Sequence, residues 1–495
     1  MGGGTSIWAS PEWKSDPREI FNWKLWYLTT TVAFAGCSYG FDQGNIGGVL
    51  TLPSFKKAFG LDVLSENEAD ERAGDIAAML AAGGSAGALI AAPFADFLGR
   101  KKSMTVFAAL FLIGATMQEI AHLPTFYAGR FIAGLAIGGT SMLAPQYLGE
   151  NSPKSIRGSL TTSYNLCIIL ALRGKREKGL TNLCKLRNLP SEHPYVAQEY
   201  MEVCAQVDSE QELTKGSNYW VVIKDIVTIP SNRRRFFLAT FLFLFHKFTG
   251  TDSLNYFAPE IFEMIGVQSG SLSLLTTGVY GLVKLATTII YVAYIVDRVG
   301  RRRPLLEVKV GAVLQATAML YIALYIRFAK PDSTGGTPAG GIVGIIWVYI
   351  YAFGWSFGWS VAPYVVAAEI FPARIRSFSM SICFFINWIV DYGITKATPS
   401  MMTHMGWGTF LLYAVLTYIG AVFVYFCMPE FKGRSIESMD DLFQHSIWTM
   451  WRHAYPTEEE KVRHDVQEHI LQKARDEEEG GPETKKPEVT VVHQE

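Results

Sequence analysis

Apolar residues gather in long stretches that are almost free of charged side chains, and polar segments separate these stretches. A helix needs about 20 apolar residues to cross the hydrocarbon core of a bilayer, and ten stretches are each about 19–28 residues long. The pattern therefore predicts an all-α polytopic membrane protein. The predicted spans are 26–50, 76–95, 103–121, 125–148, 234–257, 271–296, 305–326, 341–368, 378–401 and 408–428.

Basic residues in the short loops predict the orientation of these spans, because lysines and arginines near span ends stay in the cytoplasm. Four basic loops fall on the same side of the predicted membrane. We therefore expect a multi-pass protein of the plasma membrane with both termini in the cytoplasm. The four loops contain residues 99–102, Lys154 and Arg157, residues 298–303, and Arg374 and Arg376.

An eleventh apolar stretch, 158–172, has only 15 residues and is followed by a basic segment. If it crossed the membrane, segment 173–232 would lie outside and every later span would be inverted. The simplest explanation is that the rest of this helix and one whole following helix are absent from the chain. The alternative is a re-entrant or interfacial segment at 158–172, which also keeps 173–232 inside.

Two motifs occur once in each half of the chain, which indicates two parallel repeats. One motif places a carboxylate four residues before an arginine and the other seven, each at the cytoplasmic end of a predicted span. The orientation of the spans in the membrane would require only the basic residues, and it does not explain the carboxylates at a fixed distance from them. Because such pairs form charge-assisted bonds that can exist in one conformation and break in another, we predict a cytoplasmic latch. Its residues are Asp96, Arg100, Glu150, Arg157, Asp297, Arg301, Glu369 and Arg376.

Composition adds mainly exclusions. Only 18% of the residues are charged, and 44 lysines and arginines balance 45 acidic residues, so no bulk charge favours nucleic acid. The six cysteines include no C-x-x-C pair, which argues against a zinc site or a disulfide framework. No protease, hydrolase, P-loop or dinucleotide-binding motif occurs in a suitable context. We expect neither an enzyme with catalytic residues nor a metal-binding protein.

An ordered set of short motifs resembles one family. The set comprises Phe41-Asp42-x-Gly44, Gly129-Arg130, Pro145-x-Tyr147-x-x-Glu150, the two repeated motifs, Asn255-Tyr256-x-Ala258-Pro259, Glu369-Ile370-Phe371-Pro372, Asn387-Trp388, Pro429-Glu430-x-Lys432-Gly433 and Asp440-x-Leu442-Phe443. Together they resemble the sugar porter family of the major facilitator superfamily, over about 23–215 and 232–443.

The resemblance implies a major facilitator fold of two six-helix bundles around a central site. In this chain the N-terminal bundle would lack part of the fifth helix and all of the sixth. The expected organisation is a cytoplasmic N-terminal segment (1–22), a truncated N-terminal bundle (23–172), a cytoplasmic linker (173–232), a C-terminal bundle (233–428) and a charged cytoplasmic tail (429–495).

The family's function then becomes the expectation for this chain. It implies alternating-access transport of a monosaccharide, polyol or sugar acid, often with a proton as coupling ion and no other cofactor. We expect a monomer in the lipid bilayer, without nucleic acid as a partner. Two other functions stay open: a membrane nutrient sensor of the same fold, and a transport-defective product of a transporter gene.

Ionisable residues inside spans are costly and are therefore candidates for function. Asp42 lies in the first span and Arg130 at the start of the fourth. By resemblance they pair in proton-coupled members of the family, where the arginine keeps the carboxylate ionised in one state and releases it in another. A static structural ion pair is the alternative.

The span 234–257 departs from the family pattern of two glutamines followed five residues later by asparagine. This chain has His246, Lys247 and Asp252 instead. A buried lysine beside a histidine favours an anion, such as a uronic acid or a quinate-like acid. The alternative is that Lys247 and Asp252 neutralise each other.

The remaining substrate candidates are placed by the resemblance. Amides can bond hydroxyl groups, and aromatic rings can stack on the apolar face of a sugar ring. Other aromatic residues of the spans, Trp347, Trp355 and Trp359, are assigned to packing, and Lys284, Asp391 and Lys396 to pairing between helices. The candidates are Asn165, Asn255, Tyr256, Tyr364, Asn387 and Trp388.

Overall fold

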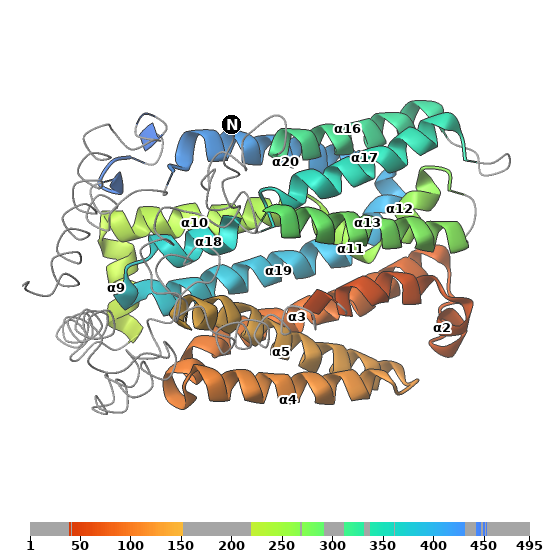
Figure 1. Cartoon of the computed structure of the whole chain (residues 1–495). Helices are drawn as coiled ribbons and strands as arrows, with labels where there is room; N and C mark the ends of the chain where they lie inside the picture. Colours follow the sequence, from red (N-terminus) through yellow and green to blue (C-terminus); the bar gives the residue numbers. More distant parts are fainter. Residues whose placement is uncertain are drawn as a thin grey trace, which may run out of the picture.

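The computed structural model describes ten segments of the chain: 39–40, 42–151, 219–267, 270–291, 311–330, 337–360, 362–430, 442–446, 449–450 and residue 452. Every regular element in these segments is a helix. The helices form an elongated bundle in which most long helices run roughly along one direction (Figure 1). Six of them are long and apolar enough to cross a membrane.

The N-terminal half begins with a helical segment at 42–51 and continues through four helices. Glu68 accepts hydrogen bonds from the backbone nitrogen and the hydroxyl of Ser65, which caps α3. Gly99, at φ +83°, ends α3 and allows the sharp turn into α4. The bounds are α2 Pro53–Ala58, α3 Glu66–Leu98, α4 Arg100–Gln118 and α5 Leu123–Asn151.

Helices α3 and α5 pack with their backbones in direct contact. A Cβ atom added to Gly134 would lie 2.0 Å from the carbonyl oxygen of Leu80, and one added to Gly138 would lie 2.0 Å from that of Gly84. Gly83 and Gly87 make the reciprocal approaches from α3. Small residues commonly allow this closeness between membrane helices, where packing and hydrogen bonds replace the hydrophobic effect as the attraction.

The C-terminal half contributes the other described helices. Their bounds are α9 Tyr219–Thr228, α10 Pro230–Phe248, α11 Thr251–Tyr256, α12 Ala258–Met264, α13 Gly270–Ile290, α16 Ala312–Ala329, α17 Ala339–Ser356, α18 Ala362–Ile370, α19 Ala373–Met405 and α20 Trp407–Cys427. They cover the described parts of the six spans predicted for this half.

Two predicted spans are discontinuous helices, which their apolar patterns do not indicate. Span 234–257 breaks after α10, where Gly250 has the left-handed φ of +81°. Span 341–368 breaks between α17 and α18, where residues 357–360 form a turn. Breaks of this kind expose backbone polar groups at membrane depth and are tolerated where they are buried in protein or line a cavity.

Helix α19 joins the two halves by packing along α3 (Figure 1). Ser381 donates a hydrogen bond to the carbonyl oxygen of Ala88 at 2.7 Å. Nearer the other end, Lys396 Nζ lies 2.7 Å from Asp75 Oδ1. This interface therefore has polar contacts at both ends.

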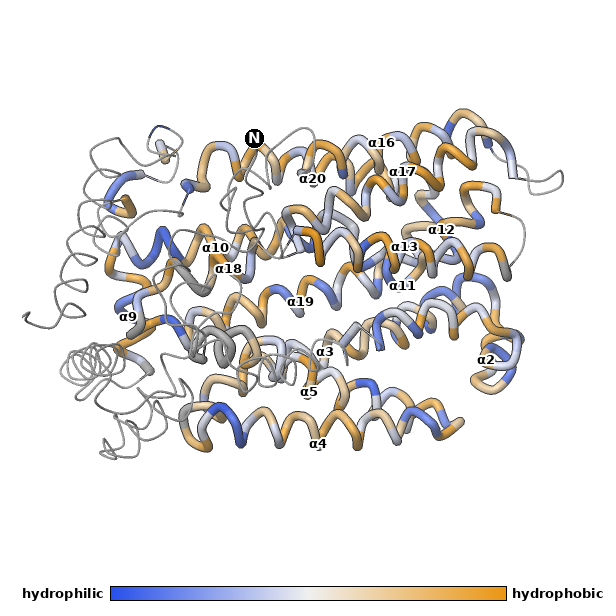
Figure 2. Tube along the Cα trace, in the orientation of Figure 1, coloured by the Kyte–Doolittle hydropathy of each residue, from blue (hydrophilic) through white to orange (hydrophobic). Residues whose placement is uncertain are grey.

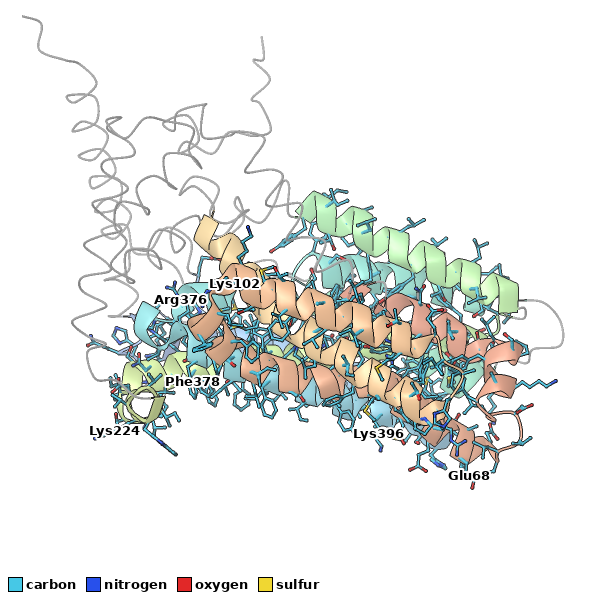
Figure 3. All side chains as sticks on the ribbon, turned by 90° about the horizontal axis from the view of Figure 1, so that it is seen from below. Glu68, Lys102, Lys224, Arg376, Phe378 and Lys396 are labelled. Carbon is cyan, nitrogen blue, oxygen red and sulfur yellow. The ribbon has the colours of Figure 1, made fainter. Side chains whose placement is uncertain are left out.

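Charge marks the ends of the bundle. Hydrophilic positions colour the N-terminal ends of α4 and α10, whereas the middle of the bundle is mainly apolar (Figure 2). Lys102, Lys224 and Arg376 lie at one end, and Glu68 and Lys396 lie toward the other (Figure 3). The three basic residues predicted to be cytoplasmic thus share one end of the molecule.

Candidate functional site

Asp42 and Arg130 are brought together as the sequence predicted. Arg130 of α5 is fully buried, and its Nη1 lies 3.5 Å from Asp42 Oδ2. Its Nη2 donates a hydrogen bond to the carbonyl oxygen of Ala77 on α3 at 3.2 Å. The pair therefore connects the first helix with α3 and α5, and its part in proton coupling stays a prediction.

Lys247 lies between two carboxylates. Its Nζ is 2.9 Å from Asp252 Oδ2 and 3.0 Å from Asp391 Oδ2, and all three side chains are at most 3% exposed. Thr395 donates a hydrogen bond to the other oxygen of Asp391 at 3.1 Å. We call Lys247, Asp252 and Asp391 the charged triad. Its geometry favours the alternative in which Lys247 is neutralised within the protein.

The charged triad is also tied to the N-terminal half. Gln43 donates a hydrogen bond to Asp252 Oδ1 at 3.1 Å. Its neighbour Asp42 faces Arg130 instead, so two consecutive residues of the first helix serve opposite halves of the bundle. Gln43 was missed by the sequence analysis, and its only signal is a polar side chain beside an acidic residue inside an apolar stretch.

Lys284 of α13 differs from Lys247 in its partners. Its Nζ donates a hydrogen bond to Asn255 Oδ1 at 2.9 Å and lies 4.0 Å from the centre of the Trp355 ring. Among the described residues no carboxylate forms an ion pair with it. All three residues were expected to pair between helices. Asp391 and Lys396 form ion pairs with residues of other helices. Lys284 instead contacts an amide and an aromatic ring.

Aromatic rings line the region between the two lysines. His246 lies 6.0 Å from Trp355 and 5.7 Å from Tyr364, measured between ring centres. Trp355 Nε1 is buried without a hydrogen-bond partner. Trp355 was assigned to packing from the sequence, because nothing in an aromatic-rich span distinguishes a ring that faces a site.

Trp388 of α19 lies beside the charged triad, and Asn387 precedes it in the helix. The indole of Trp388 donates to Ser141 Oγ of α5 at 3.2 Å, and its ring is 5.7 Å from Lys247 Nζ. Asn387 is buried, and its Oδ1 accepts no hydrogen bond. The hydroxyl of Tyr256, a fully buried residue, is likewise without a partner.

The cytoplasmic latch stays a prediction. Asn165 and three latch residues, Arg157, Asp297 and Arg301, lie outside the described residues. For Asp96, Glu150 and Glu369 only the backbone is described. Arg100 begins α4, and Arg376 Nε donates to the carbonyl oxygen of Phe371 at 3.1 Å.

A pocket of about 320 Å³ lies apart from these residues, between α3, α12 and α19. It is lined by Asp70, Glu260 and Glu263, and Thr403 donates a hydrogen bond to Asp70 across it. The pocket contains none of the residues predicted to bind substrate. Its carboxylates make it unsuited to an anion.

Sequence comparison identifies the family. The family described as "Sugar (and other) transporter" matches residues 28–172 and 169–443. The chain belongs to this sugar transporter family. The two matched segments meet at 169–172, where the sequence analysis places the missing residues.

Relatives within the sugar transporter family extend over nearly the whole chain. A probable quinate permease of Aspergillus fumigatus is 31% identical over 527 residues, covering 94% of this chain and 96% of the relative. A quinate permease of Emericella nidulans is 32% identical over 502 residues, covering 90% and 93%. Both aligned lengths exceed the 495 residues of this chain, so the relatives contain residues that it lacks.

Solved structures give the same fold. The proton:xylose symporter XylE of the major facilitator superfamily, bound to 6-bromo-6-deoxy-D-glucose, has a TM-score of 0.68 at 21% identity, covering 85% of this chain and 99% of that one. XylE from E. coli in a partially occluded inward-open conformation has a TM-score of 0.59 at 21% identity, covering 83% and 99%. The chain therefore has the major facilitator fold, and its family makes it a multi-pass membrane transporter and not an enzyme.

Proposed function

We propose that this chain is a secondary transporter of a polyhydroxylated carboxylic acid of the quinate kind, moved together with a proton by alternating access. The names of the relatives support the substrate class, because two of them are quinate permeases at 31–32% identity. The site offers a cation, amides and aromatic rings, which are the groups that a ring bearing hydroxyls and one carboxylate requires.

Lys284 is the observation that carries this proposal. A charged group at membrane depth is costly unless it is paired, and Lys247 already has two carboxylates. Lys284 has only an amide oxygen and the faces of two aromatic rings, Trp355 and Tyr280. A substrate carboxylate would give Lys284 a direct ionic partner. This assignment moves the anion site from Lys247 of α10, where the sequence placed it, to Lys284 of α13.

The rest of the substrate would extend from Lys284 and Trp355 toward other polar groups in the centre of the bundle. Trp355 Nε1 and the Tyr256 hydroxyl are donors without partners, and Asn387 Oδ1 is an acceptor without one. Buried polar groups are normally satisfied, so substrate hydroxyls are suitable partners for them. Trp355 and Tyr364 offer flat faces for the apolar side of the ring.

Proton coupling would involve Asp42 and Arg130. The 3.5 Å separation of Arg130 Nη1 from Asp42 Oδ2 is an ion pair that a small helix movement could weaken. Weakening it removes the charge that favours the ionised carboxylate, which would then accept a proton. A static ion pair is the alternative, and a change of Asp42 distinguishes the two.

The test measures quinate binding to the purified chain in lipid nanodiscs. Lys284→Gln removes one charge-assisted hydrogen bond, worth about 1.5–3 kcal/mol, so the Kd for quinate should rise by about 10- to 150-fold. Binding of neutral glucose should change by less than about threefold in the same variant, because no charge is involved.

Lys396→Gln is the matched control, since Lys396 of α19 is an exposed lysine that is paired with Asp75 of α3. Its Kd for quinate should equal that of the parent chain. Absence of quinate binding by the parent, or an unchanged Kd in Lys284→Gln, would contradict the proposal.

A transport-defective product is the second candidate, favoured by the break in the family match at 169–172. In that case the chain would bind substrate through its C-terminal half and accumulate none in vesicles. Insertion of the missing residues from a quinate permease would restore accumulation.

A further inference from the structure

Four charges lie in and beside the buried centre of the C-terminal half. The charged triad contributes one positive and two negative charges, at side-chain exposures of 0–3%. Lys284 contributes the second positive charge from α13 and reaches the same region through Asn255 and Trp355. The four groups sum to zero only while Lys284 has no anion beside it.

The other titratable groups that face this centre do not change the balance. Asp42 and Arg130 neutralise each other, and His246 of α10 forms no ion pair among the described residues. The remaining groups are phenols, which are neutral at physiological pH. They come from the described residues 39–40 and from α11, α13, α17, α18 and α20, in the order Tyr39, Tyr256, Tyr280, Tyr351, Tyr364 and Tyr413.

We propose that Asp252 and Asp391 bind one shared proton whenever an anion occupies the Lys284 site. This inference rests on the proposed function for the identity of the anion, and not for the proton site itself. It makes the charged triad a second proton-binding site, separate from Asp42 and Arg130.

The charge balance explains the coupling. A substrate carboxylate cancels Lys284 and leaves the charged triad with an unbalanced negative charge inside the protein. Uncompensated buried charges are strongly destabilising, and two carboxylates close to one another favour protonation of one of them. A proton from bulk water then binds a carboxylate oxygen and forms a carboxylic acid, while Lys247 stays an ammonium ion.

The geometry leaves room for this proton. Both oxygens of Asp391 accept hydrogen bonds, one from Lys247 and one from Thr395. Asp252 Oδ1 accepts a hydrogen bond from Gln43, and its Oδ2 lies 2.9 Å from Lys247 Nζ. Because the two oxygens of a carboxylate have about four lone-pair positions, these contacts leave a position at which a proton can bind. Because the carboxylates share Lys247, the proton belongs to the pair and not to one residue.

Gln43 gives the site a link to conformational change. It is the first-helix residue that donates to Asp252, across the boundary between the two halves. Movement of the first helix away from α11 would remove this donor. The ionised form of Asp252 would then be less stable relative to the protonated form. The charged triad would therefore hold its proton differently in the two conformations of a transport cycle.

The first experiment needs no substrate. Lys284→Gln removes the same charge that a bound anion cancels, so this variant in nanodiscs should gain about one carboxylic acid per molecule at neutral pH, seen as an infrared C=O band. The double variant Lys284→Gln with Asp391→Asn should lose that band. Lys396→Gln, which breaks an exposed pair, should gain none. No added band in a folded Lys284→Gln chain would overturn the inference.

The second experiment uses the unaltered chain and quinate. Calorimetry in two buffers of different ionisation enthalpy should show uptake of about one proton per quinate bound, and about none in Asp391→Asn. The Kd of the parent should then change by up to about tenfold per pH unit, and that of Asp391→Asn should not. Proton uptake that persists in Asp391→Asn and in Asp252→Asn, or is lost only in Asp42→Asn, would overturn the inference.

The two experiments separate failure of the two proposals. An added infrared band without quinate binding would support the proton site and refute the quinate-type function. Quinate binding that depends on Lys284 but takes up no proton would support the function and refute the proton site.

Discussion

Replacing Gly134 by alanine should destabilise the N-terminal half, because the added methyl group would collide with the backbone of α3. The new Cβ would lie 2.0 Å from the Leu80 oxygen, 2.8 Å from its carbonyl carbon and 3.0 Å from its Cα. These are backbone atoms that cannot rotate away. Since real Cβ contacts essentially never fall below 3.0 Å, α3 and α5 must separate locally by about 1 Å.

A gap of that size forfeits about a quarter to a half of each atomic contact along the interface. Overpacking usually costs about 1–3 kcal/mol, and a clash between two backbones belongs at the upper end. We expect the free energy of unfolding to fall by about 3 kcal/mol. The higher helix propensity of alanine offsets at most about 1 kcal/mol of this.

Unfolding in increasing fractions of sodium dodecyl sulfate, followed by circular dichroism, measures this difference. Gly278→Ala is the matched control, because Gly278 is also inside a long helix but has no atom within 4 Å of the added Cβ. Its stability should be unchanged or slightly higher. If the two variants unfolded within about 0.5 kcal/mol of each other, the close backbone contact and the reasoning from it would be wrong.

Two further predictions concern coupling and topology. In a chain with the missing residues inserted, Asp42→Asn should abolish accumulation driven by a pH gradient yet keep counterflow exchange. The reason is that an amide cannot bind and release a proton as a carboxylate does. Full accumulation of labelled quinate by this variant would exclude Asp42 from coupling. A cysteine introduced at Lys178, which lies outside the described residues, should not react with an impermeant thiol reagent applied to intact cells. The 15 apolar residues 158–172 would span only about 22 Å as a helix, against a hydrocarbon core of about 30 Å. Strong labelling would show that segment 158–172 crosses the membrane.

The sequence predicted the helices well and their interruptions poorly. Apolar length alone marks a span, because the bilayer imposes it. The break between α10 and α11 depends on the left-handed conformation of Gly250, and a glycine in a membrane helix serves close packing as often as it serves a turn. The discontinuity that positions Lys247 before the break and Asp252 after it was therefore invisible in the pattern.

The site was predicted in part for a similar reason. Asp42 and Arg130 were paired through a resemblance, and Lys247 and Asp252 through their spacing along the chain. Asp391 lies 144 residues after Lys247, and nothing local indicates which of several buried charges it would meet. The partners of Lys284 were equally hidden, because an amide and a tryptophan are ordinary residues of a membrane helix.

The glycine contacts between α3 and α5 also constrain how the molecule can move. Where two backbones touch, no side chain is left to change rotamer and absorb a displacement, so one helix cannot slide past the other without a collision. We therefore expect α3 and α5 to move together as one rigid body. The boundary between α3 and α19 is less tight, because a Cβ added to Gly74 would lie 2.6 Å from the carbonyl oxygen of Lys396, against 2.0 Å at the α3–α5 contacts. Lys396 also reaches Asp75 through a long side chain. We therefore expect the two halves to move relative to each other along this boundary.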